Sequence, residues 1–228
     1  MRAIILSLTL LVIGACASQG PSSFNYNRLD LQIVTVDTPT DLIRAAREGD
    51  HAGIRRALEQ GDLINAVAPE GSAFSVAIRQ GYPVIASFLL SAGANWRTGF
   101  PPGQPSALML ASERGENRLV KQLILNGAAL DDTDNSGYSA LTLAAMKGHL
   151  TTMSILINAG ADVDNVADGK SILMHVVEDN NVLLSQRLIK AGADVNYRDE
   201  NGDTALRIAR RKGFFDIDLM LVQAGARP

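Results

Sequence analysis

The spacing of glycine constrains this 228-residue chain more than any other feature of its sequence. Glycines recur in pairs 12 residues apart, and the pairs recur every 32 to 34 residues. The first members of the pairs are Gly49, Gly81, Gly115, Gly148 and Gly213, with Asn180 holding that place in the fifth pair. The second members are Gly61, Gly93, Gly127, Gly160, Gly192 and Gly225.

A third mark keeps the same register, because a Ser or Thr stands nine residues before the first member of each pair. These residues are Thr40, Ser72, Ser106, Ser139, Ser171 and Thr204. Ser and Thr side chains accept hydrogen bonds from the free N–H groups of a helix's first turn, and Gly or Asn tolerates the left-handed backbone that closes a helix. Chance spacing of 20 glycines would not stay in phase with a Ser/Thr series. The sequence therefore predicts six like-sized helical units.

The stretch from Asp134 to Val166 contains one complete unit. Ser139 can cap a short helix whose apolar face holds Leu141, Ala144 and Ala145, and Gly148 ends that helix. A second apolar run then ends at Gly160. Helix-start and helix-stop rules give the order turn, helix, loop, helix, turn.

This pattern resembles the ankyrin repeat, on residues 137–149, 160–163, 192–196 and 201–206. The resemblance implies an all-α solenoid of about six helix–loop–helix units joined by short β-hairpin-like turns, over residues 38–228. The units are expected at about 38–67, 68–98, 99–133, 134–166, 167–198 and 199–228.

The chain departs from the family pattern at the Thr-Pro-Leu-His start, because its units lack both the Pro and the His throughout. The His position is taken by Ser75, Met109, Thr142, Met174 and Arg207. We therefore expect the hydrogen bonds that such a His gives between units to be missing, and a somewhat less stable array.

The N-terminus has the composition of a secretory signal at residues 1–15. Arg2 is followed by an apolar run to Ala15 that is shorter than the roughly 20 residues of a membrane-spanning helix. Cys16, the only cysteine, completes what looks like a bacterial lipobox, so we expect it to carry lipid. An ordinary secretory signal is the alternative. Ala17 in place of Asp favours the outer membrane of a Gram-negative envelope, with the chain facing the periplasm.

Residues 16–37 are expected to form a tether and an N-terminal extension. A flexible composition at residues 18–23 is followed by the alternation of Leu29, Leu31 and Ile33 with polar residues, a weak strand signal. We expect this piece to lie against the first unit and partly to cover its exposed edge.

Motifs that would indicate catalysis or a cofactor do not withstand inspection. Asp132 to Gly137 opens like a calcium loop, but Leu143 stands where that loop needs a bidentate Glu. The three histidines fall in different units, and no phosphate-binding loop or nucleophile elbow occurs. We therefore expect no enzyme activity, no cofactor and no metal.

Charge argues against nucleic acid as a partner. The chain carries 21 basic and 24 acidic residues, and removal of Arg2 with the signal leaves 20 against 24, or −4. One basic cluster, residues 207–212, is expected to be a solvated face.

A long turn at residues 95–105 carries Trp96, Arg97 and Phe100 among prolines. Aromatic and Arg side chains on a projecting loop are common anchors of a binding surface. Packing of Trp96 and Phe100 back onto neighbouring helices is the equal alternative.

By resemblance, partners bind on the concave face, at the two positions before each first glycine mark and at the turn tips. The former are Arg79, Gln80, Glu113, Arg114, Met146, Lys147, Glu178, Asp179, Arg211 and Lys212. The tips add Tyr138, Asp168, Lys170, Glu200 and Asn201.

The sequence thus predicts a monomeric, non-catalytic protein–protein interaction scaffold, anchored by lipid in the bacterial envelope. Two alternatives stay open: a dedicated inhibitor or immunity protein for an envelope toxin or effector, and a structural component gripping the cell wall. Mild acidity counts against the last.

The final helix, residues 214–222, is strongly apolar for a unit with no neighbour beyond it. Either Asp216, Asp218 and Gln223 give it a polar face, which we favour, or another molecule covers it.

Overall fold

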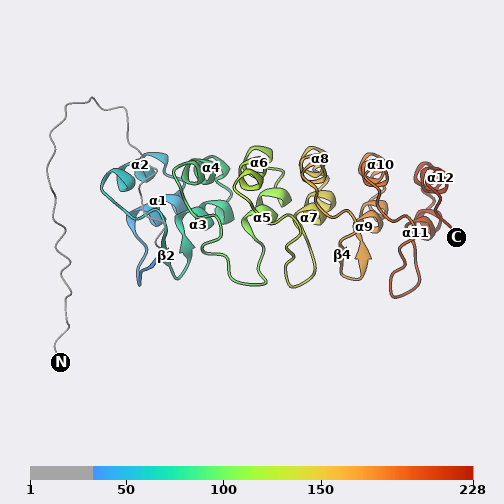
Figure 1. Cartoon of the computed structure of the whole chain (residues 1–228), viewed down its shortest axis with the longest axis horizontal. Helices are drawn as coiled ribbons and strands as arrows, with labels where there is room; N and C mark the ends of the chain where they lie inside the picture. The colour runs from blue at the N-terminus through green and yellow to red at the C-terminus, as the bar shows by residue number, and fades with distance from the viewer. Residues whose placement is uncertain (1–32, 228) are drawn as a thin grey trace.

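The structure, a computed structural model, describes residues 33–227 as a straight row of helix pairs with turns projecting from one side (Figure 1). The predicted signal peptide, Cys16 and the predicted tether up to residue 32 lie outside the described residues. The first helices of the six units, called the inner helices, are α1 Asp41–Glu48, α3 Ala73–Gln80, α5 Ala107–Glu113, α7 Ala140–Met146, α9 Ile172–Glu178 and α11 Ala205–Lys212. The second, outer helices are α2 His51–Glu59, α4 Pro83–Ser91, α6 Asn117–Leu125, α8 Leu150–Ala159, α10 Val182–Lys190 and α12 Phe215–Gln223. The predicted fold class is confirmed.

The helix ends follow the glycine and Ser/Thr marks. Each of the six Ser or Thr side chains accepts a hydrogen bond from the backbone N–H three residues later, at 3.2 or 3.3 Å. All twelve Gly or Asn marks adopt positive φ, from 54° at Asn180 to 98° at Gly93. The predicted caps are therefore confirmed in every unit.

Short strands form the projecting turns. Strand β2, Ala66–Ala68, pairs antiparallel with β3, Gly71–Ser72, and β4, Val166–Ala167, pairs with β5, Lys170–Ser171. Strand β1, Val34–Thr35, lies parallel to β2. Of the strand predicted from Leu29, Leu31 and Ile33, only Ile33 lies within the described residues; β1 follows it and borders the hairpin between the first two units.

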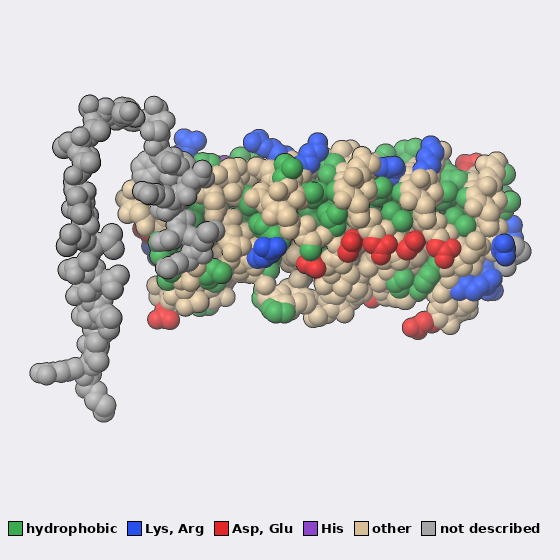
Figure 2. Space-filling model, viewed as in Figure 1, with side chains coloured by type: hydrophobic (Ala, Val, Ile, Leu, Met, Phe, Trp, Pro, Cys, Tyr) green, Lys and Arg blue, Asp and Glu red, His purple; other side chains and the backbone are tan. Residues whose placement is uncertain are grey.

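Asn and Asp side chains link successive units by a ladder of hydrogen bonds. The side chains of Asn65, Asp131, Asp164 and Asn196 accept backbone N–H groups 30 or 31 residues later, at 2.7 or 2.8 Å. Acidic side chains of this ladder belong to the row of Asp and Glu that crosses the face shown in Figure 2. At the position of the missing His in the fourth unit, Thr142 Oγ1 donates to Asn165 Oδ1 of the same unit at 2.6 Å. The units are thus joined by Asn and Asp side chains, while the bonds that the family's His would give are absent from the described residues.

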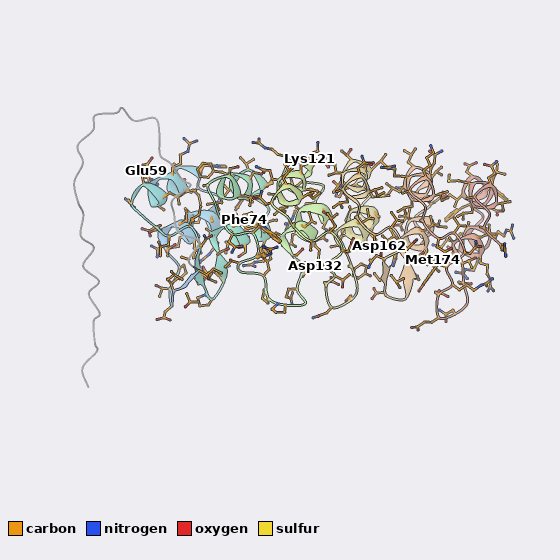
Figure 3. All side chains as sticks on the ribbon, viewed as in Figure 1. Glu59, Phe74, Lys121, Asp132, Asp162 and Met174 are labelled. Carbon is orange, nitrogen blue, oxygen red and sulfur yellow. The ribbon has the colours of Figure 1, made fainter. Side chains whose placement is uncertain are left out.

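The core is a series of layers between units, into which Phe74 and Met174 point (Figure 3). One outer-helix position is fully enclosed in five units, where it is Ile54, Ala86, Val120, Met153 and Ser185. In the sixth unit this position is Asp218, and the enclosed inner-helix position of Val177 becomes Arg210. Arg210 Nε donates to Asp218 Oδ1 at 3.1 Å. These residues give the stack a polar end, as a terminal repeat requires.

The last outer helix nevertheless keeps an apolar stripe in solvent. Phe215, Leu219 and Val222 are 82%, 59% and 46% exposed. Of the residues expected to make this helix polar, Asp218 lies on the end face, while Asp216 and Gln223 are exposed elsewhere on α12. No helix within residues 33–227 combines the length and apolar character needed to cross a bilayer.

Ser112 gives a test of this packing. Its hydroxyl is fully buried and has no hydrogen-bond partner among residues 33–227, and the fourth unit carries Ala145 at the same position. We expect Ser112→Ala to raise the free energy of unfolding by up to about 1 kcal/mol, because it removes an unsatisfied buried group. Ser139→Ala, the matched control, removes a cap and should lower it by about 1 kcal/mol. Urea unfolding followed by circular dichroism distinguishes them, and equal losses would show that the Ser112 hydroxyl is bonded.

Candidate functional site

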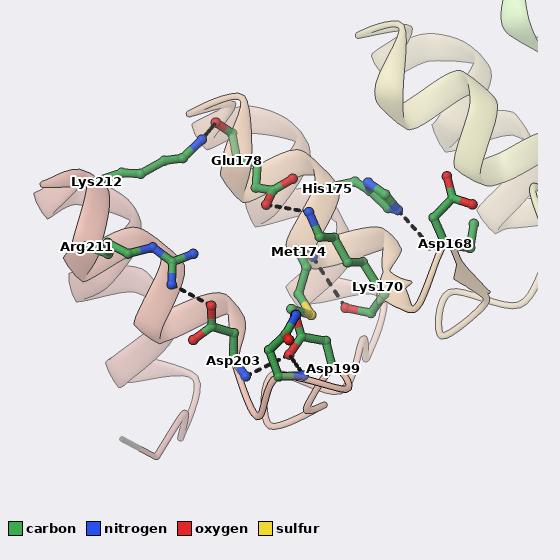
Figure 4. A network of polar contacts seen from close by, with 12 residues as sticks. Asp168, Lys170, Met174, His175, Glu178, Asp199, Asp203, Arg211 and Lys212 are labelled. Carbon is green, nitrogen blue, oxygen red and sulfur yellow. Dashed lines mark hydrogen bonds and ion pairs between the residues drawn. The ribbon is translucent and has the colours of Figure 1, made fainter.

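The turn tips and the C-terminal ends of the inner helices form one face, called here the hairpin-side face. In its last two units, charged side chains pair with one another (Figure 4). Lys170 Nζ donates to Glu178 Oε1 at 2.7 Å, and both side chains are about two-thirds buried. Lys212 Nζ donates to the backbone oxygen of Glu178 at 2.9 Å. These three predicted residues therefore lie together.

Arg211 extends this cluster to the last turn. Its Nη1 donates to Asp203 Oδ2 at 2.5 Å, and this bond holds the pKa of Asp203 below its ordinary value. Asp199 shapes the same turn, because its Oδ1 accepts the N–H groups of Asn201 and Asp203 at 2.9 and 2.8 Å. Glu200 stays exposed at the tip.

Tyr138 and Asp168 join the turns of the fourth and fifth units. The Tyr138 hydroxyl donates to Asp168 Oδ2, and this bond, with burial as the next cause, raises the pKa of Tyr138 to about 12. The Tyr138 ring lies 6.2 Å from the ring of His175, whose Nε2 is 3.0 Å from the oxygen of Ala167. His175 thus supports the turn that carries Asp168.

Several predicted site residues also hold the stack together. Arg114 Nη2 donates to the backbone oxygen of Arg79 at 2.9 Å, and Arg114 Nη1 donates to that of Ile78 at 2.5 Å. Lys212 Nζ likewise donates to the backbone oxygen of Glu178, at the C-terminal end of α9. A cation at the C-terminal end of a helix is favourable because the last carbonyl groups carry partial negative charge. Arg114 and Lys212 are therefore partly occupied by the neighbouring unit.

The remaining predicted residues of this face are freer. Lys147 Nζ lies 3.5 Å from Glu113 Oε1 across the third and fourth units. Met146 is 37% exposed. Asp179 is also exposed, and it forms no ion pair within residues 33–227. Gln80 is also exposed at the end of α3. The face thus combines fixed charges with an uncovered apolar side chain.

Trp96, Arg97 and Phe100 form a separate group at the boundary of the second and third units. Trp96 Nε1 donates to the oxygen of Asn126 at 3.2 Å, and the Phe100 ring meets Phe74 edge-on at 6.3 Å. Both rings pack partly against the core, so the packing interpretation holds for each. They also line a depression of about 630 Å³ beside Asp131 and Asp132.

Arg79 anchors this long turn, a structural role that sequence reasoning missed. Its Nη1 donates to the Gly99 oxygen at 2.8 Å, and its guanidinium lies 5.9 Å from the centre of the Phe100 ring. Burial lowers the pKa of Arg79. The wall formed by Asp131 and Asp132 was missed as well, because Asp131 follows the Gly-Ala helix ending like an ordinary turn residue and Asp132 was considered only as the start of a calcium loop.

The stretch that resembles a calcium loop folds as a turn. Asp134 Oδ1 accepts the N–H groups of Ser136 and Tyr138 at 2.9 and 3.0 Å. The described residues contain no group of three or more His, Cys, Asp or Glu side chains placed to hold a metal ion.

Comparison with known proteins identifies this architecture. Family models described as ankyrin repeats match residues 98–167 and 172–222. A crystal structure of an ankyrin repeat domain from Acinetobacter baumannii is 33% identical, with a TM-score of 0.74, and the match covers 82% of this chain and 98% of that one. The chain belongs to the ankyrin-repeat family. The ankyrin repeat domain of Bcl-3, described as a member of the IkappaB protein family, matches 84% of this chain and 89% of its own at 27% identity and a TM-score of 0.70.

Curated ankyrin-repeat relatives are much longer proteins. The Ankyrin repeat and KH domain-containing protein mask-1 of Caenorhabditis elegans is 27% identical over 84% of this chain. The Nuclear factor NF-kappa-B p105 subunit of Gallus gallus is 34% identical over 61% of it. This chain spans only 7% and 15% of the lengths of these two proteins.

The phenol of Tyr138 should titrate apart from an ordinary tyrosine. The raised pKa means that the folded protein holds this proton where the unfolded chain loses it, so the bond to Asp168 stabilises the fold below about pH 10 and is lost as the pH rises toward about 12. Ultraviolet absorbance of tyrosinate should show a late step that Tyr138→Phe removes and Asp168→Ala moves toward the ordinary pKa. A late step that persists in Tyr138→Phe would refute the assignment.

Proposed function

We propose that this ankyrin-repeat protein is a non-catalytic scaffold that binds another protein on its hairpin-side face. Ankyrin-repeat domains generally bind other proteins, and the stack supplies a stiff surface for that purpose. The main support is the arrangement of charge on this face. The pairs Glu113–Lys147, Lys170–Glu178 and Asp203–Arg211 follow the inner-helix ends from the third to the sixth unit, and the exposed side chain of Met146 stands at the end of α7, next to Lys147.

Prepaired charges suit a binding surface because they are already oriented. A side chain that is held before binding loses less conformational entropy when a partner arrives, which is the general advantage of preorganisation. Lys170 and Glu178 are each fixed by the other, and Lys212 is fixed by the Glu178 carbonyl. An uncovered methionine among such groups adds an adaptable apolar contact.

The N-terminal sequence supports attachment to a membrane by lipid on Cys16, facing the periplasm. Together with Ala17, it favours the outer membrane of a bacterial envelope. In this arrangement the lipid on Cys16 and the tether and extension of residues 16–37 hold the array near the membrane while the hairpin-side face binds its partner.

A photo-crosslinker at position 146 tests the binding face. In intact cells we expect Met146 replaced by a photoreactive phenylalanine analogue to trap one dominant protein, because this side chain lies among the predicted contacts. The matched control is the same replacement of Leu125, an 86% exposed outer-helix residue, which should trap none of it. Equal capture from both positions would contradict the assignment of the face. One-to-one capture of a toxin would instead identify a dedicated inhibitor.

Cys16→Ser tests the anchor. If Cys16 carries lipid, the substitution should move the protein from the membrane fraction to the soluble fraction and abolish incorporation of labelled palmitate. Substitution of Ala17 by Ser, which keeps the cysteine, should leave both properties unchanged. Membrane association of the Cys16→Ser protein without label would remove the lipid anchor from the proposal.

A further inference from the structure

A row of carboxylates runs along the face shown in Figure 2, on the loops that lead from the outer helices to the turns; Figure 3 labels Asp132 and Asp162 in this row. Its members are Asp131, Asp132, Asp162, Asp164 and Asp194. All five are exposed, and within residues 33–227 none of them forms an ion pair. This row therefore differs from the hairpin-side face, where most charges are already neutralised.

Four of the five carboxylates are held in place by the backbone. Oδ1 of Asp131 and of Asp164 accepts an N–H of the following unit at 2.8 and 2.7 Å. Oδ1 of Asp162 and of Asp194 accepts the N–H two residues later, at 2.9 and 2.8 Å. Asp132 accepts no such bond in the described part of the chain. The row is thus a line of negative charge, held in place at four of its five members, that forms no ion pair within residues 33–227.

One end of the row opens into a depression with mixed polar and apolar walls. The space of about 630 Å³ has Asp131 and Asp132 on its wall, and Trp96, Phe100 and Met109 contribute apolar side chains to the lining. A pocket with aromatic and aliphatic walls beside carboxylates suits a long cationic side chain, whose methylene groups pack while its charged end meets the acid.

Arg97 shows that the indole accepts such a group. Its guanidinium lies 4.2 Å from the centre of the Trp96 ring. Arg97 also stands at the sequence position that is Asn65, Asp131, Asp164 and Asn196 in other units, so it interrupts the Asn/Asp ladder. An intramolecular cation thus lies beside Asp131 and Asp132 without pairing with either.

We propose that the depression and the acidic row bind an extended, Lys- and Arg-bearing segment of a partner protein. One basic side chain stacks on Trp96 beside Asp132, displacing Arg97, and further basic side chains lie along Asp162, Asp164 and Asp194. Charge complementarity selects this occupant. The proposal rests on the protein-binding function and specifies the chemistry of the segment bound.

The chain carries its own probe for this site, because Trp96 is its only tryptophan. The purified full-length chain is titrated with the peptide acetyl-(Gly-Lys-Ser-Arg)3-amide and with the matched peptide in which Glu replaces Lys and Arg. We expect a saturable change in Trp96 emission with the basic peptide only, with an affinity that falls as salt is raised. Absence of that change, or an equal change with the acidic peptide, would overturn the proposal.

Three variants locate the contact. Asp132→Asn should weaken the basic peptide by about twofold to fivefold, as expected for one exposed charge pair. Glu59→Gln, which removes the same charge from an exposed position on α2 outside the row, should leave the affinity unchanged. Arg97→Asn, which installs the residue of the first and fifth units, should tighten binding because it frees the indole and removes a competing cation.

The outcomes separate this proposal from the function on which it rests. Equal weakening by Asp132→Asn and Glu59→Gln would show attraction to net charge alone and would sink the proposal, as would weaker binding by Arg97→Asn. If position 146 still traps a partner in those circumstances, the hairpin-side scaffold stands and only the basic-segment site is lost. Unchanged melting temperatures show that the variants remain folded.

Discussion

Burial between neighbouring units is the interaction on which the rest of this structure depends. A single helix pair encloses little apolar surface, so each unit becomes stable only when the next one covers it. Ala86 and Val120 are fully enclosed for that reason, at a position shared by successive outer helices. The same constraint explains the polar end of the stack, where Arg210 and Asp218 pair with each other on a face that no described unit covers. The exposed stripe of Phe215 and Leu219 is the part of that end that this pair does not make polar.

Stacking also places the functional groups, because their partners come from adjacent units. Arg114 reaches the carbonyl groups of α3, and Tyr138 reaches Asp168 of the following turn. Such residues connect binding to stability. A partner that recruits Arg114 must replace the carbonyl groups it gives up, whereas contact with Met146 leaves the stack intact. Residues of this face therefore differ in what it costs the stack to engage them in binding, although they look alike in the sequence.

The sequence predicted the helices well because their ends are set locally. Ser171 caps α9 through an N–H only three residues away, and Asn180 needs only its own backbone conformation. The bonds between units could not be placed in the same way, since they join residues 30 to 36 positions apart and require the stacking register. The ladder did leave a signal, because Asp131, Asp164 and Asn196 recur with the period of the glycines. Trp96 both packs partly against the core and remains partly exposed, so the sequence could not decide between a packing role and a binding role.

The charged side chains of this protein fall into two groups: those that neutralise each other within the fold and those that keep their net charge. On the hairpin-side face, Lys170 and Glu178 neutralise each other, so a partner gains orientation there more than long-range attraction. In the acidic row, one oxygen of Asp164 and one of Asp194 each accept a backbone N–H group, and both carboxylates keep their net charge. Fixed, unneutralised charge acts beyond contact distance and is screened by salt, whereas paired charge acts mainly at contact. Attraction of a basic segment and close docking on the hairpin-side face therefore draw on different surfaces of one rigid stack, and each can change without loss of the other.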